Sequence, residues 1–230
     1  CVGSSPKKRV EAAAPETRLR ALREAGAPNR VVLITVAGLE SADFLGPTGF
    51  AAGEGEAVRM PNLARLAAEG VTGLRARPPA PGSTYAAHAT LVTGLRPDRH
   101  GVVADEALDP QGQRAVPFLD SRLLRATTLW DAALGRGVLA LGWPTTDGAR
   151  IELLVPDVEA DPEAGSWLAR LRTRSTPRLT TDLEAIAAEQ LEATPRDAVG
   201  AKRTLASWPT VGERDAAFVE LACRVAASDR

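Results

Sequence analysis

The sequence predicts an α/β fold with a mostly parallel sheet. The run Arg30–Val36 is apolar and β-branched over the length of one strand, which is typical of a strand buried on both faces of such a sheet. Later in the chain, a capped helical pattern at 127–135 is followed at once by a second strand-like run at 138–141. Helices and strands that alternate over short connections indicate a doubly wound sheet.

Composition limits both the size of the protein and its partners. With 230 residues and 44% hydrophobic content, the chain can bury one sizeable core, or one domain with a subdomain. The near balance of 28 basic and 29 acidic residues argues against a general nucleic-acid-binding surface. It is compatible with a small phosphate-bearing substrate or ligand. Cys1 and Cys223 fit no disulfide framework or structural zinc pattern, and no apolar run is long enough to span a membrane.

The composition of residues 1–29 predicts a flexible tether, which leads into a domain at 30–230. They are rich in Ala, Pro, Glu, Lys and Arg and contain few large apolar side chains. The chain starts at Cys1, without an initiator Met, so it has been processed or cut. One interpretation is an exported, periplasmic or membrane-anchored bacterial lipoprotein with its lipid on Cys1, and the other is an arbitrary fragment boundary. The sequence leaves both open.

The first strand leads to a candidate ligand-binding edge. After it, Ala37–Glu40 leaves the sheet at its carboxyl edge, where ligands bind in open α/β sheets. Pro61–Gly70 then carries apolar residues at helical spacing, with Pro at its start and Gly at its end, as helix termini favour. Val71–Arg77 predicts a short strand that delivers the chain to a Pro-Gly turn.

The segment after that turn holds the candidate reactive residue. Thr84 directly precedes a predicted helix that ends near Gly94, where unpaired helix amides attract an anion. His88 lies one turn after Thr84 and is a conceivable base for its hydroxyl, although a hydrogen-bonded histidine that supports the helix is the favoured interpretation. His100, before Gly101, is interpreted as a turn residue.

Two further helices are predicted in the second half of the chain. Asp182–Glu192 follows a Thr181/Glu184 capping box, and Glu213–Ala227 carries one apolar stripe. We expect the apolar faces of both helices to pack into the core. The stripe of the second helix consists of Phe218, Leu221, Ala222 and Val225.

Three separated stretches form one ordered set: the apolar run at 32–39, the Pro-Asn-Leu helix at 60–70 and the segment from Thr84 to Val102. Together they resemble the type I phosphodiesterase/nucleotide pyrophosphatase family of the alkaline phosphatase superfamily. Trp143-Pro144 also matches a turn of this family. The resemblance implies a three-layer, alkaline-phosphatase-like fold, of which 30–230 is the N-terminal portion. It also implies a metal-dependent hydrolase that acts on phosphodiester or pyrophosphate bonds.

The resemblance further implies a threonine nucleophile held between two divalent metal ions, usually zinc. Thr84 stands at the matching position, both as nucleophile and as metal ligand. A threonine hydroxyl is almost wholly protonated at neutral pH, so a metal ion is needed to stabilise its alkoxide.

The sequence departs from the family pattern at two of these positions. Ala37 stands where the family has a metal-binding Asp, and Asp105 stands where it has an Asn that donates to a phosphate oxygen. In this phosphate-binding position, an ionised Asp105 would repel that oxygen by about 4 kcal/mol at about 4 Å and an effective dielectric constant of about 20. Protonation of Asp105, or a metal ion bound to it in a rearranged site, would remove this repulsion. The resemblance implies further Asp and His metal ligands in the second half of the domain, and no His follows His100, so we expect the domain to be incomplete at the C-terminus. The alternative function is therefore a catalytically impaired relative that binds a phosphate-bearing ligand or partner.

Overall fold

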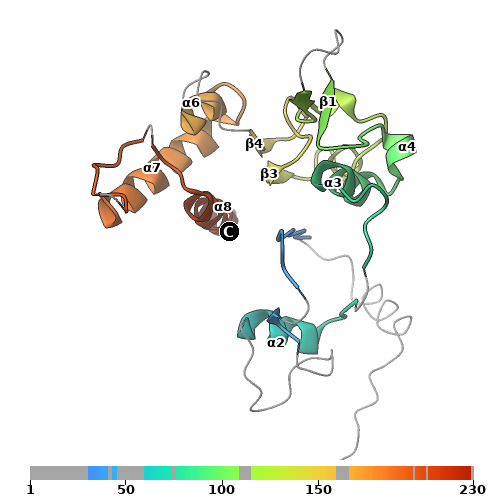
Figure 1. The fold of residues 1–230 in the computed structure, drawn as a ribbon, viewed down its shortest axis with the longest axis horizontal. Helices are drawn as coiled ribbons and strands as arrows, with labels where there is room; N and C mark the ends of the chain where they lie inside the picture. Colours follow the sequence, from blue (N-terminus) through green and yellow to red (C-terminus); the bar gives the residue numbers. More distant parts are fainter. Residues whose placement is uncertain are drawn as a thin grey trace, which may run out of the picture. The chain divides into compact units, whose positions relative to one another are not determined.

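The computed structural model divides the chain into two compact units, one up to Arg77 and one from Pro78 onward (Figure 1). The predicted tether at 1–29, with Cys1, lies outside the described residues. The structure describes residues 31–40, 43–45, 60–73, 76–108, 115–158, 166–198, 200–205 and 207–228.

The first unit contains the predicted Pro-Asn-Leu helix. Helix α2 (Pro61–Glu69) begins with Pro61 in its first turn, and the Gly70 amide closes it by donating to Leu66 O at 2.8 Å. None of its residues is buried. The prediction of this helix and of its two ends is confirmed.

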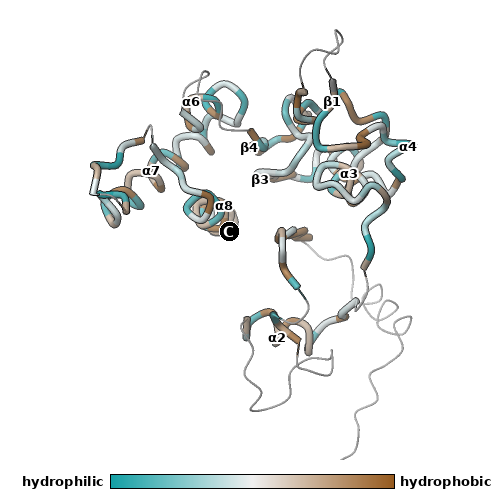
Figure 2. Tube along the Cα trace, viewed as in Figure 1, coloured by the Kyte–Doolittle hydropathy of each residue, from teal (hydrophilic) through white to brown (hydrophobic). Residues whose placement is uncertain are grey.

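The predicted strand at 30–36 is wrong for its described residues. Residues 31–36 form no strand, and their apolar side chains are exposed, with Val31 at 83% and Ile34 at 75% (brown in Figure 2). A strand needs a neighbour for its backbone N–H and C=O groups. Among the described residues of this unit, no second strand supplies one. The strand predicted at Val71–Arg77 is absent from its described residues for the same reason.

The second unit mixes helices with two small sheets (Figure 1). Strands β1 and β2 pair antiparallel, whereas β3 and β4 pair parallel, with Leu139 opposite Leu153. The elements are α3 (Thr84–Thr93), α4 (Pro97–His100), β1 (Glu106–Leu108), β2 (Ala115–Pro117), the 3-10 turn η2 (Ser121–Leu123), α5 (Leu129–Ala132), β3 (Leu139–Trp143), β4 (Leu153–Pro156), α6 (Trp167–Arg172), α7 (Pro177–Ala193) and α8 (Val211–Ser228).

The parallel pair is consistent with the predicted α/β fold of the alkaline phosphatase type. Strand β3 lies within one or two residues of its predicted position, and the helix before it is shortened to the single turn of α5. The described strands form only two-stranded sheets, so they do not themselves show the larger, mostly parallel sheet of a three-layer fold.

A main hydrophobic core joins the parallel strands to the last three helices. Leu221 and Val225 are buried and Phe218 packs against them, so the predicted apolar stripe of the last helix faces the core. Trp167 and Trp208 meet edge to face, with ring centroids 5.5 Å apart. The buried members are Val155, Val158, Trp167, Leu168, Leu171, Leu179, Leu183, Ile186, Ala187, Trp208, Ala217, Leu221 and Val225.

Helix α7 starts earlier than the sequence pattern indicated. It begins at Pro177, so the predicted cap Thr181 lies inside the helix, where its Oγ1 donates to Pro177 O at 3.2 Å. The predicted Thr181/Glu184 capping box is therefore wrong. Its partner Glu184 instead accepts a hydrogen bond from Arg172 on α6 at 2.7 Å.

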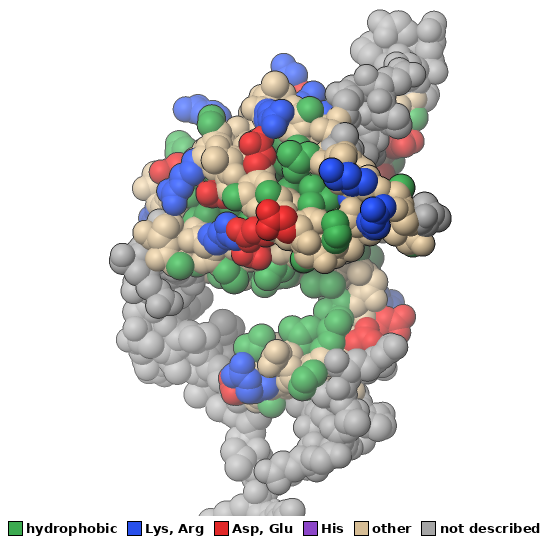
Figure 3. All heavy atoms as spheres, turned by 90° about the vertical axis from the view of Figure 1, so that its left-hand side faces the viewer, with side chains coloured by type: hydrophobic (Ala, Val, Ile, Leu, Met, Phe, Trp, Pro, Cys, Tyr) green, Lys and Arg blue, Asp and Glu red, His purple; other side chains and the backbone are tan. Residues whose placement is uncertain are grey.

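Surface charges of both signs are interspersed on the side of this unit that carries α6 and α7 (Figure 3). Arg224 on α8, for example, contacts Glu189 at 2.8 Å and Glu220 at 2.6 Å. This mixture agrees with the formal net charge of -1. Over the ranges that the structure describes, no helix combines the length and apolar character needed to cross a bilayer.

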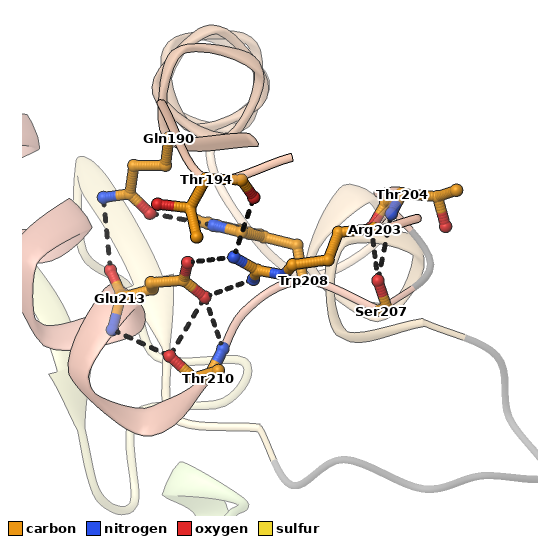
Figure 4. Close-up of polar contacts among 8 residues, drawn as sticks. All are labelled: Gln190, Thr194, Arg203, Thr204, Ser207, Trp208, Thr210 and Glu213. Carbon is orange, nitrogen blue, oxygen red and sulfur yellow. Dashed lines mark hydrogen bonds and ion pairs between the residues drawn. The ribbon is translucent and has the colours of Figure 1, made fainter. Parts of the chain in front are cut away.

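An ion pair fixes the connection from α7 to α8 (Figure 4). Both terminal nitrogens of Arg203 reach the two carboxylate oxygens of Glu213, each at 2.6 Å, and these side chains are only 7% and 20% exposed. Glu213 and Thr210 also form a capping box, in which the Thr210 amide donates to Glu213 Oε2 at 2.9 Å. Beside them, Trp208 Nε1 donates to Gln190 Oε1 at 2.8 Å. The hydrogen bonds that Glu213 accepts, above all those from Arg203 and then those from Thr210, lower the pKa of Glu213 from 4.5 to about 2.

We predict that this ion pair makes stability depend on pH in acid. Because the pKa of Glu213 is lower in the folded protein, its contribution is complete above pH 4.5 and is lost as the pH falls toward 2. Glu213→Gln should cost about 1–3 kcal/mol at pH 7, and that difference should shrink between pH 4.5 and 2. Thermal unfolding followed by circular dichroism at each pH measures it.

The matched control is Glu220→Gln, which removes an exposed carboxylate from an i,i+4 pair with Arg224. Exposed pairs of this kind contribute at most about 1 kcal/mol, so this variant should change stability little at any pH. A Glu213→Gln loss that stays constant down to pH 2 would contradict the assignment.

Strand β3 is irregular at Gly142, where α8 packs against it. Gly142 has a φ of 59°, and the pairing register with β4 shifts between Leu141 and Trp143. A Cβ atom at Gly142 would lie 2.4 Å from Cε2 of Phe218. The bare backbone therefore makes room for the Phe218 ring.

We predict that Gly142→Ala lowers the free energy of unfolding by about 2–5 kcal/mol, because a positive φ and an overpacked contact add together. Gly135→Ala is the control, since Gly135 has a φ of 78° but nothing within 4 Å of its would-be Cβ. It should cost only about 1–2 kcal/mol. Urea denaturation compares the two, and equal losses would rule out the Phe218 contact as the cause.

Candidate active site

Thr84 lies at the first turn of α3, as the sequence predicted. Gly82 turns the chain with a φ of 76°, and Ser83 is the extended residue that precedes the helix. Thr84 is exposed, whereas Ser83 Oγ is buried and has no hydrogen-bond partner among the described residues. The helix ends at Gly94, whose φ is 67° and whose amide donates to Thr90 O.

Asp105 lies directly beside this turn. Its Oδ1 accepts a hydrogen bond from the Tyr85 amide at 2.6 Å, and its backbone oxygen accepts one from the Phe118 amide at 3.0 Å. The carboxylate therefore satisfies one of the unpaired amides at the positive end of the α3 dipole. The phosphate-binding role expected at Asp105 stays a prediction, and the contact observed here is with the helix next to Thr84.

His88 contacts the backbone of Thr84. Its Nδ1 lies 2.7 Å from Thr84 O, which can only accept a hydrogen bond, so Nδ1 carries a proton. The ring also meets Trp143 edge to face, with centroids 4.9 Å apart. These contacts agree with the interpretation of His88 as a support for the helix.

Sequence reasoning missed Asp157, which joins α3 to the parallel strands. It directly follows β4, and its Oδ2 accepts a hydrogen bond from the Tyr85 hydroxyl at 3.2 Å. Burial raises the pKa of Asp157, against the opposing effects of the Tyr85 hydrogen bond and the charges of Arg214 and His88. The available signal was its place at the carboxyl end of an apolar run, the same kind of position that drew attention to Ala37.

His100 is fully buried and serves the turn after α4. Its Nδ1 accepts from the Val102 amide at 3.2 Å, so in the neutral ring the proton lies on Nε2, 3.0 Å from Thr90 Oγ1. Burial lowers the pKa of His100, which favours this neutral form. Gly101 follows with a φ of 89°, in agreement with the predicted turn role.

The described residues do not by themselves fit a two-metal centre. They contain no group of three His, Cys, Asp or Glu side chains placed to hold a metal ion. Ala37, at the expected ligand position, is exposed and has no ligating atom in its side chain. Oδ1 of Asp105 already accepts the Tyr85 amide.

A comparison with protein families decides the identity of this domain. The family model of type I phosphodiesterase/nucleotide pyrophosphatase matches residues 41–194, well over half of the chain. The chain belongs to this family. The match includes Thr84, Asp105 and Asp157, whereas Ala37 and α8 lie outside it. No curated protein and no solved structure matches the chain.

Membership in the type I phosphodiesterase/nucleotide pyrophosphatase family indicates a phosphoester hydrolase domain. The family is typically metal-dependent. Within this phosphodiesterase-type domain, α3 brings Thr84, Tyr85 and His88 to the carboxyl ends of β3 and β4, through the contacts with Trp143 and Asp157. In open α/β sheets, that is the edge at which ligands bind.

We predict that Asp105 stabilises α3 as a capping residue does. Asp105→Ala should lower the free energy of unfolding by about 1–2 kcal/mol. Asp105→Asn keeps an acceptor oxygen for the Tyr85 amide, so it should lower the free energy of unfolding by less. Asp98→Ala, on the exposed side of α4, is the control. Urea denaturation measures the free energy of unfolding of each variant. An Asp105→Ala variant as stable as the unmodified protein would exclude the capping role.

Proposed function

We propose that this protein hydrolyses phosphodiester or pyrophosphate bonds with Thr84 as the nucleophile. The observation that carries the proposal is an exposed hydroxyl at the first turn of α3, within the residues that the family model matches. The resemblance of the surrounding motifs to the family implies the role of nucleophile for Thr84. In this reaction, Thr84 Oγ1 gives its proton to bulk water and forms a bond to phosphorus, while the bond from phosphorus to the leaving oxygen breaks and that oxygen keeps the electron pair. A water molecule then attacks phosphorus and gives up a proton, and the bond from phosphorus to Thr84 Oγ1 breaks. Thr84 Oγ1 keeps that electron pair and takes up a proton, and the phosphate product is released.

The position of Thr84 supports this chemistry electrostatically. The positive end of the α3 dipole lies at the first turn of the helix and favours negative charge on a phosphate group there. The family resemblance implies two divalent metal ions, usually zinc, as further stabilisers of that charge. Thr84 is the one described residue that we assign to such a site.

We predict that Thr84→Ala abolishes turnover. The substrate is bis(p-nitrophenyl) phosphate, an activated phosphodiester, and the assay uses the full-length protein with zinc or manganese present. Removal of a nucleophile leaves only background catalysis, so release of p-nitrophenol should fall by at least about 1,000-fold.

Two variants serve as controls for this test. Thr84→Ser keeps a hydroxyl in place and should retain turnover. Ser83→Ala removes the neighbouring buried hydroxyl, which has no partner among the described residues, and should leave turnover close to that of the unmodified protein. Unchanged turnover in the Thr84→Ala variant would contradict the proposed function.

A second candidate function is a non-catalytic relative that binds a phosphate-bearing ligand or partner. Ala37 cannot ligate a metal, and the Asp105 carboxylate adds negative charge beside Thr84, close to where a phosphate would bind. Both features weaken catalysis while leaving the α3 scaffold in place.

For this candidate, we predict that Ala37→Asp combined with Asp105→Asn creates zinc binding that the unmodified protein lacks. Isothermal titration calorimetry with zinc alone measures it. Each single variant is a control, since each restores only one family residue. Tight stoichiometric zinc binding by the unmodified full-length protein would count against the non-catalytic function.

A further inference from the structure

Hydrogen bonds with two side chains hold the peptide group that links Thr84 to Tyr85, one donated by a side chain and one accepted by a side chain. The carbonyl oxygen of this group, Thr84 O, lies 2.7 Å from His88 Nδ1. Its amide, Tyr85 N–H, donates to Asp105 Oδ1 at 2.6 Å. Both polar ends of the peptide that follows the nucleophile therefore have a side-chain partner.

The Tyr85 side chain connects this peptide to the interior of the unit. Its ring is only 8% exposed and packs in a second buried cluster with Ala89, Val102 and Phe118. Its hydroxyl reaches Asp157, 72 positions away along the chain, at 3.2 Å.

Asp157 is itself fixed by the main core. It follows the parallel strand β4 and lies between Val155 and Val158, which are 0% and 1% exposed. The Thr176 hydroxyl on the α7 side holds the same strand by accepting from the Leu154 amide at 2.9 Å. Asp157 therefore offers Tyr85 an acceptor whose backbone has little freedom to move.

We propose that Asp157 is a positioning residue for Thr84, acting through the Tyr85 hydroxyl. This inference rests on the proposed function, because it concerns the same reaction. The Tyr85–Asp157 hydrogen bond sets the position of the first turn of α3 relative to the carboxyl ends of β3 and β4, while Asp105 and His88 fix the orientation of the peptide after Thr84.

The Tyr85–Asp157 hydrogen bond acts by preorganising the nucleophile. A nucleophile reacts fast when it is held within a fraction of an ångström of its productive position, and a misplacement of about 1 Å can cost about 100-fold in rate. Loss of the Tyr85 hydroxyl contact frees the first helical turn to shift, although the Thr84 hydroxyl itself is unchanged. The chemical step should then slow with little effect on substrate binding.

The test measures steady-state hydrolysis of bis(p-nitrophenyl) phosphate by the full-length protein. Tyr85→Phe and Asp157→Ala should each lower kcat by roughly 10-fold to 100-fold, with KM changed far less. Because both variants remove the same contact, the double variant should be no slower than the slower single variant. Asp157→Asn keeps an oxygen that accepts the Tyr85 hydrogen bond, so it should restore most of kcat.

Glu213→Gln is the matched control for a stability effect. It is also a carboxylate-to-amide change and destabilises the α7–α8 connection, but no contact links Glu213 to Tyr85 among the described residues. It should leave kcat at the assay temperature close to that of the unmodified protein. Thermal unfolding of every variant confirms that the assay samples folded protein.

The outcomes separate this inference from the proposed function. If Thr84→Ala is inactive while Tyr85→Phe and Asp157→Ala keep full kcat, the positioning role is overturned and the proposed function stands. Multiplicative losses in the double variant, or no rescue by Asp157→Asn, also overturn it. If Thr84→Ala keeps its turnover, or if the unmodified protein shows no turnover, both the proposed function and the positioning role are overturned.

Discussion

The unpaired backbone groups at the start of α3 are the constraint on which the site depends. A helix begins with amides that have no partner inside the helix, and buried or partly buried ones must find one elsewhere. Here Asp105 supplies that partner from the residue before β1, and Tyr85 carries the constraint further to Asp157 after β4. The start of α3 thus contacts a residue next to each of the two sheets, and the exposed Thr84 is the first residue of this helix.

Local signals in the sequence were sufficient for some elements. The ends of α2 and α3 were predicted because Pro61, Gly70 and Gly94 act within one turn of the chain. The predicted strand at 30–36 failed, since strand formation depends on a partner that no local pattern specifies. Capping boxes show the same limit. The Thr-x-x-Glu spacing at 181–184 lies inside α7, whereas the same spacing at Thr210 and Glu213 caps α8.

The candidate site was predicted in part for the same reason. Thr84, His88 and Asp105 stand within one short stretch whose order carries the family resemblance, and the match over 41–194 includes it. Asp157 was missed because its contact with Tyr85 spans 72 positions and depends on how β4 lies against α3. A single Asp after an apolar run occurs in many structural roles, so this pattern alone does not predict a contact with α3.

The position of α8 in the main core has a practical consequence for the choice of boundaries. Family similarity ends at residue 194, yet Ala217, Leu221 and Val225 of α8 are buried against the helices and strands that the family match contains. A recombinant protein cut at residue 194 would expose the apolar surfaces of α6, α7 and β3 that α8 covers. Such a surface promotes association between copies. A recombinant version of the domain therefore has to include α8, even though the family match stops at residue 194.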